Sequence, residues 1–422
     1  MYQPQFIWES GIWGPIPRWL SLPDVAAIES VARKQIRLSA GDHISVTFFA
    51  EGAFNKLFTI TVSNSGSTLG TPQYIFRATA PVEPFFKIAG EVATLSYLQE
   101  HTSIPVPRII AHSSTSDNEV GCEWILMEKI PGVALADVWR DIDLETKNKV
   151  TRSVVGYVRQ LRDLRRCFTG IGTLYFREEI DTLKAPVRVV RAKDEKYVLG
   201  PLVTPYMFAG GRKLRVARDL GPYSNDAEYI AALTASELED MKLLLSPDAR
   251  LHSDFDEDLA DEAENIILTL NQLQQILPAL FPSKPRNFAL HHHDLSLRNI
   301  LVDPATHQIT GIVDWECVGT RPHWEDTYPQ FLRGPEITEE EPLAPGDTDP
   351  IRVECWENWE KVKLRLVFDK ELGETRHDDD GRDEIRRGFR KQLDIVGIST
   401  KMTQDWMNEY GDRCTNVLSE IS

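Results

Sequence analysis

Three side chains in the C-terminal half of the chain have the types and spacing that phosphoryl transfer requires. Asp294 is followed five residues later by Asn299, and Asp314 stands at the end of an apolar, strand-like run. Transfer from ATP needs one carboxylate that orients the accepting hydroxyl, and an amide and a second carboxylate that hold Mg²⁺ on the phosphates. The pattern predicts Asp294 as the catalytic base, and Asn299 and Asp314 as the Mg²⁺ ligands.

The segments around these residues indicate how the chain would position them. The apolar residues 300–302 lead into the turn-like residues 303–308, and a second apolar run, 309–313, ends at Asp314. Two short apolar runs joined by such a turn predict a β-hairpin. The hairpin would carry Asp294 and Asn299 before its first strand and Asp314 after its second.

The three consecutive histidines at 291–293 suggest a different chemistry, a metal site. Neighbours on an extended segment point in different directions, and the sequence shows no second ligand cluster at the usual spacing. A metal-dependent hydrolase that uses residues 291–294 therefore stays open as an alternative, and it would require tightly bound metal.

Two motifs resemble those of a known superfamily. Residues 292–299, His-His-Asp-Leu-Ser-Leu-Arg-Asn, and residues 314–316, Asp-Trp-Glu, are similar to the catalytic motifs of the aminoglycoside phosphotransferase and choline kinase-like superfamily. Residues 91–95 and 104–107 resemble its fungal branch. The resemblance runs from about residue 45 to about residue 333. It implies an α+β, bilobal, protein kinase-like fold with a small antiparallel-sheet lobe and a larger, mainly helical lobe, in which Asp326 braces the catalytic loop.

The resemblance also implies where a nucleotide would bind. Arg77 ends the third predicted strand, where kinase-like enzymes place a basic residue against the α- and β-phosphates, and Glu91 on a predicted helix would be its partner. The superfamily usually has Lys at the position of Arg77, and Arg is not interchangeable with Lys at such a site. Lys87, one helical turn before Glu91, is the competing candidate.

Two further parts of a nucleotide site follow from the same resemblance. Gly52 and Asn55 lie in a predicted hairpin that would cover the phosphates, although the chain lacks the Gly-x-Gly-x-x-Gly of protein kinases. The strand after residue 122 ends at Pro131, as a lobe-connecting hinge would. There, the backbone carbonyl of Glu128 and the N–H of Ile130 would hold the edge of the adenine.

The elements read from the sequence divide the chain into three parts. Residues 1–40 are an N-terminal extension with one short helix, residues 41–130 a small nucleotide-binding lobe, and residues 131–422 a large lobe. The large lobe contains a helical insertion, 168–288, in which helices are predicted around 226–245 and 258–280. Further helices are predicted at 353–372 and 382–421. In the superfamily such helical elements build the acceptor site.

Composition restricts the function further. The chain of 422 residues has 47 Lys and Arg against 64 Asp and Glu, a net charge of −17, which argues against nucleic acid as a partner. An acidic surface attracts cationic substrates, but acidic charge commonly serves solubility instead. No stretch reaches the roughly 18 apolar residues of a membrane span. The five scattered cysteines have no metal-ligand spacing and indicate a reduced compartment, so the chain is predicted to be cytoplasmic.

These observations predict an ATP- and Mg²⁺-dependent phosphotransferase that acts on a hydroxyl of a small molecule. The alternative is a pseudokinase-like nucleotide-binding or scaffold protein without turnover, which Arg77 and the missing Gly-rich loop motivate. The identity of the acceptor and the oligomeric state do not follow from the sequence.

Overall fold

A computed structural model describes residues 6–11, 14–39, 41–52, 54–63, 72–208, 219–252, 255–281, 287–325, 328–335, 342, 349–373 and 381–415 of the chain. Its strands are β1 (Phe6–Gly11), β2 (Gly14–Trp19), β3 (His43–Glu51), β4 (Asn55–Ser63), β5 (Gln73–Thr79), β6 (Ile109–Ser113), β7 (Glu123–Glu128), β8 (Val133–Ala134), β9 (Thr173–Phe176), β10 (Val190–Arg191), β11 (Tyr197–Gly200), β12 (Ala289–His291), β13 (Ile300–Val302), β14 (Ile309–Ile312) and β15 (Gly319–Arg321).

The helices of the described residues are α1 (Val25–Ile36), α2 (Phe86–His101), α3 (Leu135–Val138), α4 (Leu144–Asp163), α5 (Arg177–Asp181), α6 (Pro205–Phe208), α7 (Asp226–Leu244), α8 (Glu257–Leu280), α9 (Pro350–Leu372), α10 (Asp383–Ile395) and α11 (Thr400–Thr415). Short 3₁₀ helices are η1 (Leu164–Cys167), η3 (Ala249–Leu251), η4 (His323–Glu325) and η5 (Gln330–Leu332). Within these described residues, no helix is both long enough and apolar enough to span a membrane.

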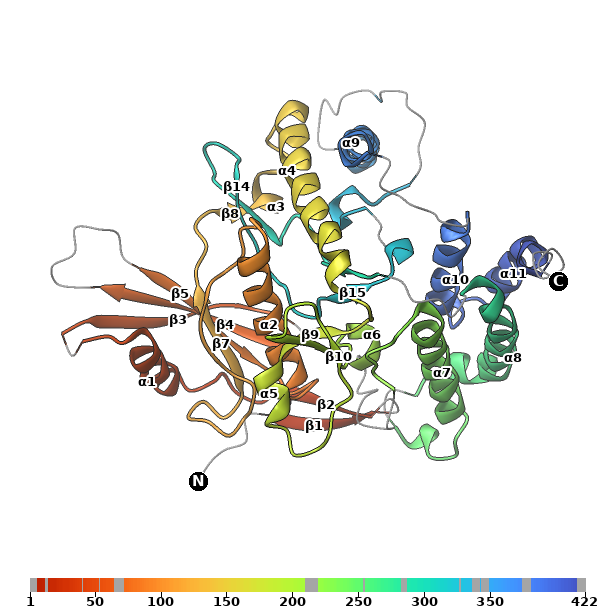
Figure 1. The fold of residues 1–422 in the computed structure, drawn as a ribbon, viewed down its shortest axis with the longest axis horizontal. Helices are drawn as coiled ribbons and strands as arrows, with labels where there is room; N and C mark the ends of the chain where they lie inside the picture. Colours follow the sequence, from red (N-terminus) through yellow and green to blue (C-terminus); the bar gives the residue numbers. More distant parts are fainter. Residues whose placement is uncertain are drawn as a thin grey trace.

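The small lobe is an antiparallel five-stranded sheet with the strand order β3-β4-β5-β7-β6, at the left of Figure 1. Successive side chains of a strand point to opposite faces, so each strand contributes side chains to the packing on both faces of the sheet. Phe58, Phe76 and their neighbours pack with α1 on one face. Ile125 and Met127 pack with α2 on the other face. The same alternation places Arg77 on the α2 side, because it is one residue away from Phe76.

A second, three-stranded sheet with the order β10-β11-β9 packs against α2 and holds it in place. The contact is close at Gly90, where a Cβ atom would lie 2.5 Å from Thr173 Cγ2. Thr173 cannot easily turn away, because its Oγ1 accepts a hydrogen bond from the Val203 N–H at 3.0 Å. The sequence predicted only helices in the 168–288 insertion. The structure confirms them as α7 and α8 but adds this sheet, which supports the helix that carries Glu91.

The large lobe is mainly helical, with α4 and α9 at the top of Figure 1 and α7, α8, α10 and α11 gathered at the right. The large lobe also contains two small antiparallel sheets, with the orders β14-β13-β8 and β12-β15. The predicted hairpin is confirmed as β13 and β14, and β12 pairs with β15. The predicted fold class, a small antiparallel-sheet lobe joined to a larger helical lobe, is therefore confirmed.

The N-terminal extension contains the predicted short helix, α1, with Asp24 as its cap. The Asp24 carboxylate accepts a hydrogen bond from the Ala26 N–H at 2.9 Å. It also contains the antiparallel pair β1–β2, which the sequence did not predict.

Candidate active site

The segment before β13 folds into a tight loop around Asp294 and Asn299. Asn299 Nδ2 donates hydrogen bonds to the Asp294 carbonyl at 2.9 Å and to its carboxylate at 3.1 Å. The Asn299 carbonyl accepts from the Val313 N–H at 2.9 Å, which joins the loop to the end of β14. Three predicted residues that are separated by up to 20 positions therefore meet at one end of the hairpin.

His292 contacts the same junction through its imidazole ring. Its ring lies edge-on to Trp315, with 4.6 Å between the ring centres, and its Nε2 lies 3.2 Å from the Val313 carbonyl oxygen. Burial lowers the pKa of His292 to about 3, so the imidazole is neutral at physiological pH and can donate Nε2–H to that carbonyl. His292 is thus a brace. Asp326, for which the resemblance implied a bracing role, lies outside the described residues.

Asp314 has a backbone φ of 65°, in the left-handed region, where side chains other than Gly, Asn and Asp are rarely found. Its carboxylate is 39% exposed and lies 4.0 Å from Arg77 Nη1. Burial and the neighbouring Glu316 raise the pKa of Asp314 to about 7, although Arg77 acts in the opposite direction. The carboxylate would be more stable with additional positive charge beside it.

The predicted pairing of Arg77 with Glu91 is confirmed. Arg77 Nη2 donates to the Glu91 carboxylate, and the two side chains are 6% and 2% exposed. Burial disfavours the charged guanidinium, but Glu91 and Glu316 outweigh it and raise the pKa of Arg77. Glu91 therefore orients Arg77 toward Asp314.

Glu316 is the centre of a buried polar network that the sequence did not predict. Its carboxylate accepts hydrogen bonds from Lys87 at 2.6 Å and from Asn55 at 2.8 Å, and lies 3.7 Å from Arg77 Nη1. Burial alone would raise the pKa of Glu316. Lys87 and Arg77 outweigh that effect and lower it to about 2.

Asn55 turns its side chain into this network. Its Oδ1 accepts from Thr79 at 3.0 Å and from Lys87 at 3.3 Å, while its Nδ2 is bound to Glu316. Gly52, at the other end of the same turn, donates its N–H to the Asn55 carbonyl at 2.9 Å. The phosphate-covering role of Gly52 and Asn55 stays a prediction, and for Asn55 it would fall to the backbone, because the amide is already occupied.

The predicted hinge residues, Glu128 and Ile130, lie at the end of β7. They contribute to the wall of a cavity of about 450 Å³ that also contacts Gln73, Tyr74 and Gly132. The Glu128 N–H donates to the Arg108 carbonyl at 2.9 Å. Adenine binding by the Glu128 carbonyl and the Ile130 N–H stays a prediction.

The charges of the site do not balance. Within the described residues, the network and its neighbour contain three carboxylates (Glu91, Asp314 and Glu316) and two cations, Arg77 and Lys87. The buried Oδ1 atom of Asp294 has no hydrogen-bond partner. Oxygen ligands with excess negative charge suit a hard divalent cation such as Mg²⁺, so the donors present fit the ion that the sequence implied.

Sequence reasoning missed Glu316, the bracing role of His292 and the true partner of Lys87. Strand alternation could not have identified Glu316, because the chain leaves β14 before Asp314, whose φ is 65°, and turns at residue 316. Its partners Asn55 and Lys87 lie 261 and 229 residues away in the chain. No local pattern contains such a contact.

Comparison with known proteins agrees with this chemistry. Residues 45–345 match the model of a family described as the phosphotransferase enzyme family. A subtelomeric hrmA-associated cluster protein of Aspergillus fumigatus is 27% identical over 357 residues, which cover 76% of this chain and 66% of that protein. The protein named altered inheritance of mitochondria protein 9, mitochondrial, of Candida tropicalis is 26% identical over 365 residues, covering 79% and 58%. The chain thus spans about two thirds or less of these relatives.

Two solved structures are similar at lower identity. A macrolide 2'-phosphotransferase from Brachybacterium faecium has a TM-score of 0.32 and 12% identity, covering 88% of this chain and 97% of that one. An aminoglycoside phosphotransferase from Alicyclobacillus acidocaldarius has a TM-score of 0.29 and 12% identity, covering 94% and 98%. The family assignment rests on the family model and not on these two likenesses.

Proposed function

Because the chain belongs to the phosphotransferase enzyme family, we propose that it transfers the γ-phosphoryl group of ATP, in the presence of Mg²⁺, to a hydroxyl of a small molecule. The observation that supports this most directly is the excess of carboxylate at Asp314, next to a loop in which Asn299 holds Asp294. The carboxylates at this site outnumber the cations by one. In the proposed reaction, the Mg²⁺ that is bound to ATP supplies the additional positive charge.

Each residue has a defined task in this proposal. Asp294 orients the acceptor hydroxyl and takes its proton, and Asn299 holds its carboxylate in place. Arg77, held by Glu91, binds phosphate oxygens through the guanidinium edge that faces Asp314. Asn299 and Asp314 would hold Mg²⁺, which when bound neutralises charge on the phosphates. Transfer then depends mainly on positioning and on charge neutralisation.

The proposal is tested by Mg²⁺-ATP binding and turnover in the purified chain. We expect Mg²⁺-ATP to raise the melting temperature of the wild type, and Asp314→Asn to remove that shift. Asn tolerates the left-handed backbone at this position, so the fold should survive the change. The matched control is Asp261→Asn, on the exposed side of α8, which should keep the full shift. An unchanged shift in Asp314→Asn would contradict the metal assignment.

Turnover separates the proposal from its alternative. A pseudokinase-like binding protein would show the thermal shift but release no ADP above the level of an Asp294→Asn variant. A phosphotransferase should release ADP slowly to water even when its acceptor is absent. Metal analysis of the purified chain addresses the hydrolase alternative, which requires bound metal before any nucleotide is added.

A further inference from the structure

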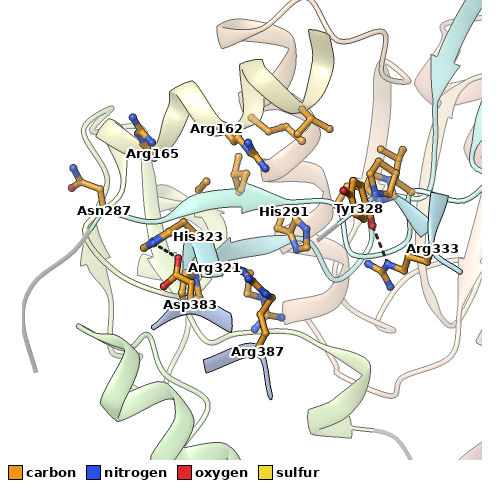
Figure 2. A pocket seen from close by; sticks show the side chains of 18 of the residues that line it. Arg162, Arg165, Asn287, His291, Arg321, His323, Tyr328, Arg333, Asp383 and Arg387 are labelled. Atoms are coloured by element: carbon orange, nitrogen blue, oxygen red, sulfur yellow. Dashed lines mark hydrogen bonds and ion pairs between the residues drawn. The ribbon is translucent and has the colours of Figure 1, made fainter. Parts of the chain in front are cut away.

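Two adjoining cavities lie in the large lobe beside β12 and β15. One has a volume of about 280 Å³ and reaches from α4 to α10 (Figure 2), and the other, of about 470 Å³, extends between α7 and α10. Both are lined by His291, Arg321, Arg333 and Arg387. The two cavities therefore adjoin at these four residues, and their volumes suit a small molecule.

The site is cationic although the chain is acidic. Among the described residues, seven Arg and Lys side chains line the two cavities against four Asp and Glu. The whole chain has the opposite balance, 47 against 64. Clustering of this kind does not follow from composition, so it identifies the cavity as a place where negative charge is expected.

Several of the carboxylates in the walls already have partners. Asp394 pairs with Arg390 at 2.5 Å, and Glu325 lies 3.8 Å from the same guanidinium. Asp383 binds His323 at 2.9 Å, as Figure 2 shows, and also binds Arg386 at 2.9 Å. These acids therefore do little to balance the other cations of the site.

Arg321 has the most unusual environment. Arg321 is 8% exposed, and among the described residues its guanidinium donates only to the hydroxyl of Tyr229, at 2.8 Å, and lies over that ring at 5.4 Å. No carboxylate pairs with it in the part of the chain that the structure describes. A buried charge without a counter-charge is costly, so such a group indicates a ligand that supplies the missing charge.

Arg387 reaches the same cavity from α10, and its Nη1 lies 3.5 Å from the Trp324 carbonyl. Figure 2 shows Arg321 and Arg387 close together beside His291. The helix that carries Arg387 begins at Asp383, beyond residue 345, where the match to the family model ends. This wall therefore lies outside the segment that matches the family model.

The cavity lies beside the proposed catalytic base. β12 runs through His291 toward Asp294, and His293, the residue before Asp294, lines the larger cavity. Burial lowers the pKa of His293, and Arg321 and Arg333 lower it further, whereas Asp294 acts to raise it. The larger cavity thus reaches the residue next to the proposed base.

We propose that this cavity is the acceptor site and that the acceptor is a small alcohol with an anionic group, a phosphate or a carboxylate, bound by Arg321 and Arg387. The inference rests on the proposed function. The acceptor hydroxyl oxygen forms the new bond to the γ-phosphorus, and its proton goes to Asp294. The bond between that phosphorus and the β–γ bridging oxygen breaks, and its electron pair leaves with ADP. Arginine suits both anions, because its planar donors bind two oxygens at once.

The first experiment measures anion binding with the nucleotide site filled. Inorganic phosphate, acetate and choline are titrated in turn, at constant ionic strength, into the chain saturated with Mg²⁺ and a non-hydrolysable ATP analogue. Binding of phosphate alone or of acetate alone tells the two anionic classes apart, and either result supports the inference. Binding of choline in preference to both anions, or binding of none of the three, would overturn it.

Substitutions then locate the anion. Arg387→Gln, whose side chain is only partly buried, should weaken binding of the anion by about ten-fold or more, the usual effect of losing a charged hydrogen bond. Arg321→Lys keeps the positive charge but loses the two parallel N–H donors of the guanidinium. Its affinity for the anion should lie between those of the wild type and Arg321→Gln. Lys401→Gln removes an exposed charge from α11 and is the matched control. Equal affinity in Arg387→Gln and Lys401→Gln would place the anion elsewhere.

The second experiment identifies the class of acceptor without knowing its name. A small-molecule extract of fungal cells is separated on an anion exchanger, and each fraction is incubated with the chain and γ-labelled ATP. Label should pass to a compound of the retained fraction. An acceptor in the unretained fraction, or none in the retained one, would contradict the inference. Failure of the proposed function is a different result, since then Mg²⁺-ATP itself would fail to bind or turn over.

Discussion

The network around Glu316 and the cavity around Arg321 are both partly buried and both rich in charge, but they are unbalanced in opposite directions. The network has one carboxylate more than it has cations, and almost every group in it has a partner within the protein. Among the described residues that line the cavity, cations outnumber carboxylates. Its most buried guanidinium, that of Arg321, donates a hydrogen bond to the hydroxyl of Tyr229 and pairs with no carboxylate among those residues. The two proposals follow from this difference: a cation is proposed for the network and an anion for the cavity.

Asp294 is linked to both regions, because it follows β12 in the cavity wall and Asn299 joins its loop to Val313, next to Asp314. It therefore tests whether the two regions serve one reaction. Asp294→Asn keeps the shape and the contact with Asn299 but cannot accept a proton. Phosphoryl transfer should fall by about 10²–10⁴-fold, the usual contribution of a positioned general base. Affinity for the Mg²⁺-ATP analogue should stay close to wild type by calorimetry. Turnover near wild type in this variant, with Asp314→Asn inactive, would show that the base lies elsewhere.

The second prediction concerns the balance inside the network. Lys87→Met leaves the Glu316 carboxylate without its shortest hydrogen bond, and removal of one partner of a buried pair typically destabilises by about 3 kcal/mol. Chemical denaturation of Lys87→Met, Glu316→Gln and the double variant measures this. The double variant should recover part of the loss, because no uncompensated charge remains. Additive losses would mean that the two side chains do not depend on each other.

The third prediction concerns the sheet that supports α2. Gly90→Ala places a methyl group against Thr173, and such overpacking costs about 1–3 kcal/mol. Because Glu91 is the next residue, the shift of α2 should also weaken nucleotide binding. Gly156→Ala is the matched control, since its Cβ would meet nothing within 4 Å on α4. Equal stability and equal nucleotide affinity in the two variants would mean that α2 tolerates displacement.

The fourth prediction concerns the acid dependence of the brace. The pKa of His292 is about 3 in the folded chain against 6.5 ordinarily, so the unfolded chain binds the proton first as pH falls below 6.5. The His292 imidazole therefore lowers the free energy of unfolding as pH falls from about 6.5 to 3, by up to about 1.4 kcal/mol per pH unit. His292→Gln can still donate to Val313 but does not titrate. Its stability should fall less steeply between pH 7 and 5 in denaturant titrations, and an identical slope would contradict this account.

Elements with strong local patterns could be predicted from the sequence. The two apolar runs of the β13–β14 hairpin, and the alternation that puts Arg77 opposite Phe76, follow from the spacing of side chains. The Arg77–Glu91 pair could be predicted because kinase-like architecture relates the two positions. Lys87 illustrates the limit of that reasoning, since it is close in sequence to Glu91 but its ammonium binds Glu316.

The rest depended on contacts between distant segments. Strands β9, β10 and β11 have two to four residues each, too few to show a period. The cationic cavity could not be predicted from composition, because the net charge of −17 describes the whole chain and not one part of it. Arg321 and Arg387 are far apart in sequence and line the same cavity only in the folded chain. Cytoplasmic location, oligomeric state and the part played by Asp326 stay predictions or open questions.

The spacing of the cavity residues on α10 has a consequence for how such chains diversify. Arg387, Arg390, Lys391 and Asp394 recur at intervals of three and four, so one stripe of a single helix forms a wall of the cavity. The hairpin with Asn299 and Asp314 belongs to a different segment. The proposed acceptor contacts and the proposed catalytic residues thus lie on separate segments, so substitutions along that stripe leave the residues of the hairpin unchanged.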